Sequence, residues 1–316
     1  MVLRSMLYVP GNNLRMITKA ATLASDAIIL DLEDAVPLAD KATARILTRD
    51  SIRAIKYGGP CVFVRVNALI TNLTVDDLGF VCIEGLDGIM LAKTETRSDV
   101  VELDGMIERA EKASGLMVGG LTIVPLIESA KGVMNANEIA SASERVAAVA
   151  FGAGDYYRDL GLSISSLSVE QTELLYARCQ VVNGSRAAGV QAIDTVFFGL
   201  LTDKEMFMKE TTLALQLGFK GKQLIHPDQI DFVNKTFSPS EGEVAYARGV
   251  VDAFEKAQSR GVGAISFQGK LVDIMNYRQA KDLVDFAALL TEREKRQLAS
   301  TVSLCEFFAT SPTRRI

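Results

Sequence analysis

The chain has 316 residues, of which 48% are hydrophobic, so it can bury one large core. Its 34 basic and 39 acidic residues give a net charge of −5, and the scattered basic residues argue against a nucleic-acid surface. No apolar run approaches the ~18 residues of a membrane span, and Pro10 breaks the first segment too early for a secretory signal. We therefore expect a cytoplasmic protein, with a processed organellar form as the open alternative.

The cysteine and histidine content narrows the kinds of site that are available. The four cysteines lie far apart and form no CxxC pair, which favours free thiols in a reducing compartment over disulfides or a zinc site. His226 is the only histidine, which argues against a Ser–His–Asp hydrolase and a multi-histidine metal centre. Standing before a proline, it is expected to be structural.

Short apolar runs recur along the chain, and amphipathic stretches separate them. The runs expected to form strands are 6–9, 27–32, 61–66, 88–92, 122–127, 146–151, 192–197 and 223–225. The stretches expected to form helices are 13–24, 39–55, 98–112, 129–142, 169–187 and 203–217, with 71–86 as the weakest helical pattern. Alternating strands and helices imply a parallel sheet with right-handed crossovers. Eight such units predict an α/β fold, a (β/α)₈ TIM barrel over residues 1–239.

The alternation stops after residue 239. Ser240 and Glu243 fit a capping box that opens an amphipathic helix, 264–272 resembles a short hairpin, and a helical region begins at Ile274. We interpret 240–316 as a C-terminal helical and hairpin extension, too short and too charged to have much core of its own. It is expected to pack over the barrel mouth or on a neighbouring subunit.

Two carboxylates end the apolar runs at the centre of the chain. Glu128 and Asp155 follow strands that are one helix apart, at the carboxyl ends where TIM barrels bind their ligands. Two carboxylates so placed can share one hard divalent cation through oxygen ligands. We therefore expect Glu128 and Asp155 to bind Mg²⁺, or Mn²⁺ in its place. The alternative is that they cap helices or form surface salt bridges.

Other ionisable and glycine residues follow the same strand ends. The turn Gly152, Ala153 and Gly154 is expected to approach a substrate and point N–H groups at its carboxylate, although it lacks the spacing of a phosphate loop. Arg65 is the natural cation for an oxyanion, with an ion pair to the acidic run at 31–34 as the alternative.

Lys93 ends the fourth predicted strand and has two interpretations. It is either a Schiff-base nucleophile or a charge partner for Glu33 or Glu128. We favour the charge partner, because an acidic cluster would keep the lysine protonated and unreactive.

Several motifs occur in one order along the chain. They are RSMLYVPGN at 4–12, DAIILDLEDAV at 26–36, FVRVN at 63–67, MLAKTE at 90–95, IESAKG at 127–132, FGAGDYYRDLG at 151–161, QAIDTVF at 191–197 and GFKGKQLIHPDQI at 218–230. From Arg4 to about Ala280 the chain resembles the citrate lyase β-subunit/malyl-CoA lyase family of the HpcH/HpaI aldolase superfamily. It looks most similar to stand-alone citramalyl-CoA and malyl-CoA lyases.

The resemblance implies a TIM barrel that cleaves or forms a carbon–carbon bond in a 3-hydroxyacyl-CoA thioester with the help of Mg²⁺. The products of cleavage would be acetyl-CoA and a 2-oxoacid such as pyruvate or glyoxylate. By motif, Glu128 and Asp155 correspond to the metal carboxylates, and Arg65 to the arginine that contacts the thioester or enolate oxygen. Asp273 corresponds to a catalytic acid/base delivered from the neighbouring subunit, which implies a homo-oligomer, a trimer or a hexamer. Many members carry a proline shortly after this aspartate, whereas this chain reads Asp-Ile-Met-Asn, so the loop shape stays open.

Coenzyme A needs cations for its phosphates. Arg4, Arg15 and Lys19 are the candidates, the last two at helical i, i+4 spacing, although solvation of the surface explains them equally well. Glu33 and Asp34 are expected to support the metal site as partners of Lys93.

Four other functions remain open at this stage. They are a citrate lyase β subunit that works only with an acyl-carrier protein and a transferase, a malyl-CoA thioesterase, a lysine-dependent aldolase acting on a free oxoacid, and a metal-dependent aldolase acting on free pyruvate. The sequence does not distinguish citramalyl-CoA, malyl-CoA, methylmalyl-CoA and citryl substrates, because one methyl group changes selectivity by only ~1–3 kcal/mol.

Overall fold

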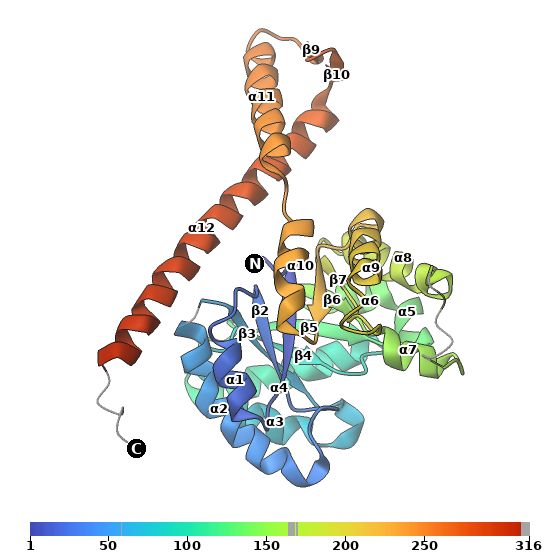
Figure 1. Cartoon of the computed structure of the whole chain (residues 1–316). Helices are drawn as coiled ribbons and strands as arrows, with labels where there is room; N and C mark the ends of the chain where they lie inside the picture. The colour runs from blue at the N-terminus through green and yellow to red at the C-terminus, as the bar shows by residue number, and fades with distance from the viewer. Residues whose placement is uncertain (58, 164–167, 169, 311–316) are drawn as a thin grey trace.

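The computed structural model describes residues 1–57, 59–163, 168 and 170–310. Eight parallel strands close into a barrel in chain order, with helices around it (Figure 1). They are β1 (Ser5–Pro10), β2 (Ala27–Asp31), β3 (Cys61–Val66), β4 (Gly88–Leu91), β5 (Thr122–Ile127), β6 (Ala148–Phe151), β7 (Gln191–Asp194) and β8 (Gly221–Leu224). The predicted TIM barrel is confirmed, although the run 192–197 was too long, since β7 ends at Asp194.

The helices between the strands follow the amphipathic stretches. They are α1 (Leu14–Ala20), α2 (Lys41–Tyr57), α3 (Thr74–Val81), α4 (Arg97–Ser114), α5 (Ala130–Met134), α6 (Ala136–Ala140), α7 (Ala153–Asp159), α8 (Thr172–Ala187), α9 (Lys204–Leu217) and α10 (Ile230–Thr236). The expected helix 129–142 is divided at Asn135, and residue 169, where another was expected to begin, lies outside the described residues. None of the described helices has the length and apolar character needed to cross a membrane.

The barrel strands are buried on both faces, which explains why their sequences are continuous apolar runs. One set of side chains packs outward against the helices, and it includes Ile28 and Leu30 of β2. The alternate set fills the barrel interior, and it includes Ala27 and Ile29 of the same strand. This two-residue period decides which side chains at the strand ends face into the barrel mouth.

The C-terminal extension forms an arm of two helices and a hairpin. It consists of α11 (Glu241–Gln258), the antiparallel strands β9 (Ile265–Phe267) and β10 (Lys270–Val272), and α12 (Ile274–Thr310). The expected capping box is present, with the Ser240 and Glu243 side chains each bonded to the other residue's backbone N–H. The arm has a small core of its own, formed by Ala247, Val250, Phe254, Val272 and Ala280.

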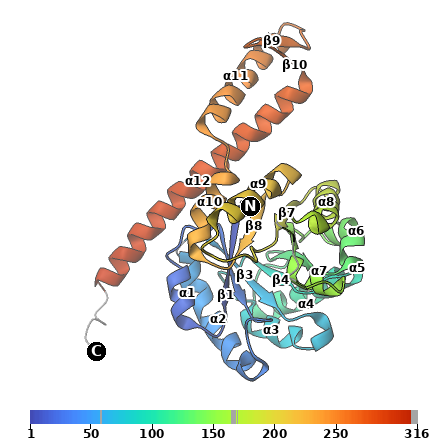
Figure 2. The ribbon, with the colours of Figure 1, turned by 45° about the vertical axis from the view of Figure 1, so that its right-hand side comes forward.

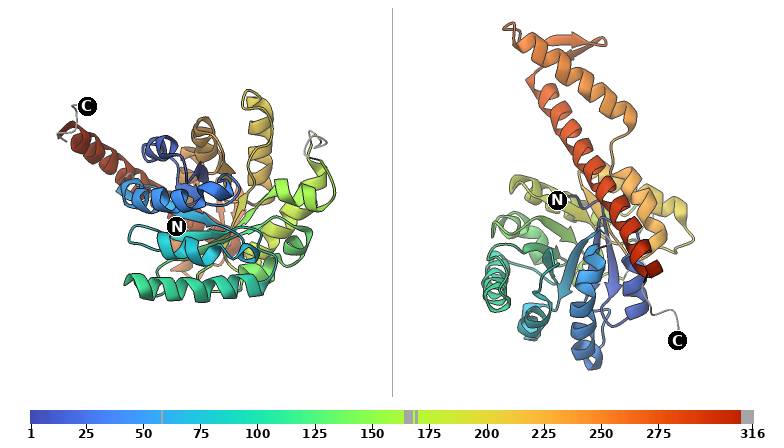
Figure 3. Two further views of the ribbon diagram at one scale, coloured as in Figure 1. Left: turned by 90° about the horizontal axis from the view of Figure 1, so that it is seen from below. Right: turned by 90° about the vertical axis from the view of Figure 1, so that its left-hand side faces the viewer.

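The arm leaves the barrel at the end opposite the mouth. The chain returns along α10 to the N-terminal ends of the strands before α11 begins, and α12 runs back beside the barrel (Figures 1, 2 and 3). There Arg293 of α12 donates to the backbone oxygens of Ser25 and Asp26, next to the start of β2, and its Nε lies 3.0 Å from Asp26 Oδ1. The expectation that the extension packs over its own barrel mouth is therefore wrong.

A buried ion network ties the last two strands to their helices. Lys222 Nζ of β8 lies 2.8 Å from Asp194 Oδ2 and 2.5 Å from Glu210 Oε1 on α9. Arg178 Nε of α8 contacts Asp194 Oδ1 at 3.0 Å, and Gln171 Nε2 donates to Glu210 Oε2 at 2.6 Å. Because every member is paired, the network fixes α8 and α9 against the barrel.

Replacing Glu210 with alanine should remove one partner and leave Lys222 buried with less compensation. We expect the free energy of unfolding in urea to fall by roughly 3 kcal/mol. Glu205→Ala is the matched control on the same helix, because the Glu205–Lys209 pair is exposed and should change stability by less than ~0.5 kcal/mol. Equal losses from the two variants would contradict a stabilising role for the buried network.

Candidate active site

The strand period places ionisable side chains inside the barrel mouth. On β2 and β3 the interior residues are Ala27, Ile29 and Phe63, so Asp31 and Arg65 also face the interior. The same period brings further residues of β1, β5 and the β6–α7 turn to the mouth: Tyr8, Glu128 and Gly152. Parallel strands all end at this side of the barrel, so these groups converge.

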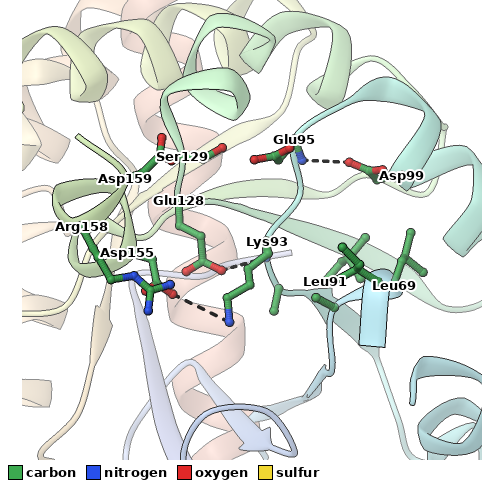
Figure 4. Close-up of a pocket in the computed structure, with 13 residues that line it drawn as sticks. Leu69, Leu91, Lys93, Glu95, Asp99, Glu128, Ser129, Asp155, Arg158 and Asp159 are labelled. Atoms are coloured by element: carbon green, nitrogen blue, oxygen red, sulfur yellow. Dashed lines mark hydrogen bonds and ion pairs between the residues drawn. The ribbon is translucent and has the colours of Figure 1, made fainter. Parts of the chain in front are cut away.

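Glu128 and Asp155 border the same open space. Both line two adjoining cavities, of about 630 and 760 Å³, which also share Arg158. In Figure 4 the two carboxylates lie close to the Lys93 ammonium. Arg158 Nη2 lies 3.3 Å from Asp155 Oδ1, and Lys93 Nζ lies 3.9 Å from Asp155 Oδ2.

Lys93 holds the carboxylates in place from both its backbone and its side chain. Its N–H donates to Glu128 Oε1 at 2.7 Å, and its backbone φ of 53° is a left-handed conformation that is unusual for lysine. Its ammonium pairs with Glu33 and lies 3.5 Å from Asp34. Burial lowers the pKa of Lys93, but the bond to Glu33 and the negative charges of Glu33, Asp34 and Glu128 together raise the pKa overall. The Lys93 ammonium therefore forms an ion pair with Glu33, and its role in the reaction stays a prediction.

Gly152 leaves room for the Glu128 carboxylate. A Cβ atom on Gly152 would lie 2.8 Å from Glu128 Oε2 and 2.9 Å from Glu128 Cβ, so only glycine fits here without displacing the carboxylate. Burial, opposed by Arg65 and reinforced by Asp155, raises the pKa of Glu128 to about 8. In the described part of the chain, Glu128 has no ion pair within 4.0 Å. A buried carboxylate that lacks a positively charged partner is suited to bind a cation through its oxygens.

Arg65 also borders the cavity, and carboxylate oxygens surround the edge of its guanidinium group. Its Nε and Nη2 bond Asp31 at 2.7 and 2.6 Å, and its Nη1 lies 3.2 Å from Glu33 Oε2. Its guanidinium carbon lies 4.8 Å from the centre of the Tyr8 ring. The ion pairing that was the alternative interpretation is present, yet Arg65 also lines the 760 Å³ cavity together with Glu128 and Asp155.

Comparison with known proteins places the chain among enzymes. The family model described as HpcH/HpaI aldolase/citrate lyase matches residues 4–227. The chain belongs to this family. It is similar to the citrate lyase β subunit of Leuconostoc mesenteroides subsp. cremoris, with 42% identity over 89% of this chain and 95% of that protein. It is also similar to the L-malyl-CoA/β-methylmalyl-CoA lyase of Cereibacter sphaeroides, with 32% identity over 91% and 95% of the two chains.

A solved structure of CitE from Mycobacterium tuberculosis, in complex with magnesium, acetoacetate and coenzyme A, also matches. It is 28% identical, the match covers 91% of this chain and 98% of that chain, and the TM-score is 0.70. The chain is accordingly a lyase-family enzyme, and the resemblance inferred from its motifs is confirmed.

The donor set at the mouth fits Mg²⁺ better than a softer metal. Among the described residues, no group of three or more His, Cys, Asp or Glu side chains is arranged to hold a metal. Mg²⁺ does not need such a group, because it is commonly bound by one or two carboxylates and completes its octahedron with water or substrate oxygens. Glu128 and Asp155 are the residues of this lyase that would hold it.

Several side chains that support the site were not identified from the sequence. Lys41 Nζ donates to the backbone oxygens of Leu32 and Glu33 and to Asn67 Oδ1, which fixes the loops after β2 and β3. Asp31 was seen only as part of an acidic run. Its position opposite Arg65 on the neighbouring strand is the signal that could have paired them.

The structure does not bring every expected residue to the mouth. Arg4 precedes β1 and therefore lies at the opposite end of the barrel, where it is 4% exposed and bonded to Asp26 and Ser238. The expectation that Arg4 binds coenzyme A is wrong for this reason. Arg15 and Lys19 are exposed on α1, whose Met16 lines the larger cavity.

Two other expectations are modified by their local contacts. Gly152 and Gly154 line the larger cavity, but the Ala153 N–H donates to Thr195 Oγ1 at 3.0 Å and is not directed at a ligand. His226 accepts the Asp228 N–H at the start of a short helix, which is the structural role expected for it.

Asp273 lies at the tip of the arm, and its Oδ1 accepts the N–H groups of Met275 and Asn276 at the start of α12. Among the described residues, none from the arm lines either cavity at the mouth.

Proposed function

We propose that this lyase cleaves or forms the carbon–carbon bond of a 3-hydroxyacyl-CoA thioester, such as citramalyl-CoA or malyl-CoA, in a Mg²⁺-dependent reaction. The other side of the reaction is acetyl-CoA with pyruvate or glyoxylate. The observation that carries the proposal is the pair Glu128 and Asp155 in one cavity with Arg65. The name of the malyl-CoA lyase relative, and the magnesium and coenzyme A bound to the mycobacterial CitE, support it.

The residues at the mouth match the charges that such a cleavage develops. Glu128 and Asp155 would hold Mg²⁺, which would supply positive charge beside the substrate hydroxyl and carboxylate oxygens, and the hydroxyl proton would pass to water in the open cavity. The electron pair of the breaking bond would move onto the thioester, and Arg65, which lines the same cavity, would stabilise the enolate oxygen. Asp31 and Glu33 hold the guanidinium at the cavity wall. The enolate carbon then needs a proton to become acetyl-CoA.

Asp273 of a neighbouring subunit is the proposed source of this proton, and in the reverse direction it would remove it. Its own chain holds it on the arm, away from its own mouth, but exposed apolar side chains flank it. They are Leu271, Ile274 and Met275. The loops around the mouth also expose apolar side chains that a partner could cover: Leu38, Ile70, Leu160, Leu162, Leu200, Leu201 and Ile225. These apolar surfaces support a homo-oligomer in which each arm completes another subunit's site. The proposed size, a trimer or a hexamer, rests on the family resemblance alone.

A second candidate is a citrate lyase β subunit acting on a citryl thioester within a multi-subunit complex. The observation in its favour is the 42% identity with the Leuconostoc subunit. The two candidates share the same site chemistry and differ in whether the isolated chain accepts a free coenzyme A thioester.

The purified chain should convert at least one member of a panel of citramalyl-, malyl-, β-methylmalyl- and citryl-CoA into acetyl-CoA and an oxoacid when Mg²⁺ is present. EDTA should abolish this activity, because neither Arg65 nor Lys93 replaces the divalent charge. Chromatography of the acyl-CoA species and an oxoacid assay would measure both products.

Other outcomes of the same assay would contradict the proposal. Release of coenzyme A without acetyl-CoA would indicate a thioesterase. Activity on a free oxoacid that resists EDTA, with borohydride trapping of Lys93, would indicate a lysine-dependent aldolase. Activity only with a carrier protein would favour the citrate lyase subunit.

Gly152→Ala should weaken metal binding without unfolding the barrel, because the new Cβ displaces Glu128 Oε2. We expect the Kd for Mn²⁺, measured by electron paramagnetic resonance, to rise by at least about tenfold. Gly79→Ala is the control, since a Cβ there meets nothing within 4 Å. Unchanged Mn²⁺ binding in Gly152→Ala would argue against Glu128 as a ligand.

Mixing two inactive variants tests whether Asp273 acts in trans. Glu128→Gln and Asp273→Asn should each be inactive alone. Mixed oligomers should regain about a third of the wild-type activity if they are trimers and about a quarter if they are hexamers, because random assembly creates sites with both native residues. Co-expression with two affinity tags would isolate the mixed oligomers. Absence of recovery in such oligomers would show that the two residues serve the same chain's site. An active Asp273→Asn variant would show that Asp273 has no role.

A further inference from the structure

We propose that Tyr8 and Gln223 are positioning residues for Arg65. Together they form a bridge across the barrel interior that holds the guanidinium flat at the mouth. The inference rests on the proposed function, because it concerns the group that faces the enolate oxygen. Both residues are uncharged, and both line the 760 Å³ cavity.

Gln223 has its orientation fixed by two strands. Its Nε2 donates to the backbone oxygens of Phe151 at 2.8 Å and Asp194 at 3.0 Å, at the ends of β6 and β7. Both amide protons are thereby used, so the remaining Oε1 can only accept. The Gln223 side chain is also buried, with 2% of the residue exposed, so it cannot turn toward water.

Tyr8 is the donor that Gln223 requires. Its hydroxyl lies 2.8 Å from Gln223 Oε1 and 3.1 Å from the sulfur of Met90. Burial raises the pKa of Tyr8, opposed only in part by Arg65, so the phenol keeps its proton and donates it. The bond fixes the position of the far end of the aromatic ring, because the hydroxyl is attached there.

The ring of Tyr8 then restricts the guanidinium of Arg65. Arg65 bonds Asp31 through Nε and Nη2, and its Nη1 lies 3.2 Å from Glu33 Oε2, so its acidic partners lie along the edges of the guanidinium and leave its two faces without a contact from them. The Tyr8 ring, 4.8 Å from the guanidinium carbon, closes one face and attracts the cation. Tilting toward the ring is therefore opposed, and the guanidinium stays at the wall of the 760 Å³ cavity, which Arg65 lines.

Binding of acetyl-CoA relative to coenzyme A tests this role without requiring turnover. Coenzyme A lacks the thioester oxygen, so the ratio of the two Kd values, measured by calorimetry with Mg²⁺ present, reports the contact with Arg65. In the wild type we expect acetyl-CoA to bind about tenfold tighter. Tyr8→Leu should remove most of this preference while leaving the Kd of coenzyme A and the Kd of Mn²⁺ unchanged. Its kcat should fall by about tenfold, with a smaller change in KM.

Tyr8→Phe is the conservative variant, and it keeps the test valid if Tyr8→Leu fails to fold. It retains the ring beneath Arg65 but loses the bond to Gln223, so the preference for acetyl-CoA should fall by about threefold. Tyr157→Phe is the matched control, because it removes a tyrosine hydroxyl that bonds Glu173 outside the cavities. It should leave the preference unchanged.

Three results would overturn the inference. If Tyr8→Phe, and Tyr8→Leu where it folds, preferred acetyl-CoA over coenzyme A as strongly as the wild type does, the bridge would not position Arg65. A tenfold weaker Mn²⁺ affinity in these variants would show that Tyr8 serves the metal carboxylates instead. A wild type that neither prefers acetyl-CoA nor turns over any thioester would remove the proposed function of Arg65 itself, which the first two results leave intact.

Discussion

The burial of Glu128 without a cation is the constraint on which the mouth of the barrel depends. Asp31 and Glu33 are neutralised by Arg65 and Lys93, whereas Glu128 receives a backbone N–H from Lys93 and forms no ion pair within the described chain. Burial is therefore the main reason that its pKa rises to about 8. A divalent ion between Glu128 and Asp155 would offset this cost, because bound cations invert the local preference for protonation. Two local features allow this arrangement. Lys93 adopts a left-handed backbone conformation, and Gly152 has no side chain that would contact the Glu128 carboxylate.

Much of the fold and of the site could be predicted because both follow from short-range patterns. Apolar runs with alternate inward positions define the strands, and the residue two places beyond the last inward side chain faces the mouth, as Glu128 does. Arg4 shows where this reasoning fails. Its motif adjoins β1, but it precedes the strand, and its partners Asp26 and Ser238 are 22 and 234 positions away. Tyr8 was missed for a similar reason, since an aromatic residue in an apolar run reads as core until its partner Gln223 is known.

The direction of the arm follows from contacts that no local pattern reveals. Arg4 and Arg293 both reach the buried carboxylate of Asp26, so the start of β1, the start of β2 and α12 share one anchor. These contacts to Asp26 lie at the N-terminal end of the barrel, so they hold the arm on the side away from the mouth. An arm attached there with its own small core is suited to reach another molecule rather than to fold back. Assembly and catalysis would then be coupled, because each site would lack its acid until a second chain supplied it.

The bridge to Arg65 also links catalysis to closure of the barrel. Tyr8 lies on β1 and Gln223 on β8, the first and last strands, which pair only when the sheet closes. Gln223 in turn bonds the ends of β6 and β7, while Arg65 and Asp31 join β3 to β2. An open sheet would retain Glu128 after β5 and Asp155 on α7, but it would leave the Tyr8 hydroxyl without its acceptor Gln223. The entropic cost of this closure grows only slowly with the 215 positions that separate Tyr8 from Gln223, so a contact between residues far apart in the sequence can help to orient Arg65.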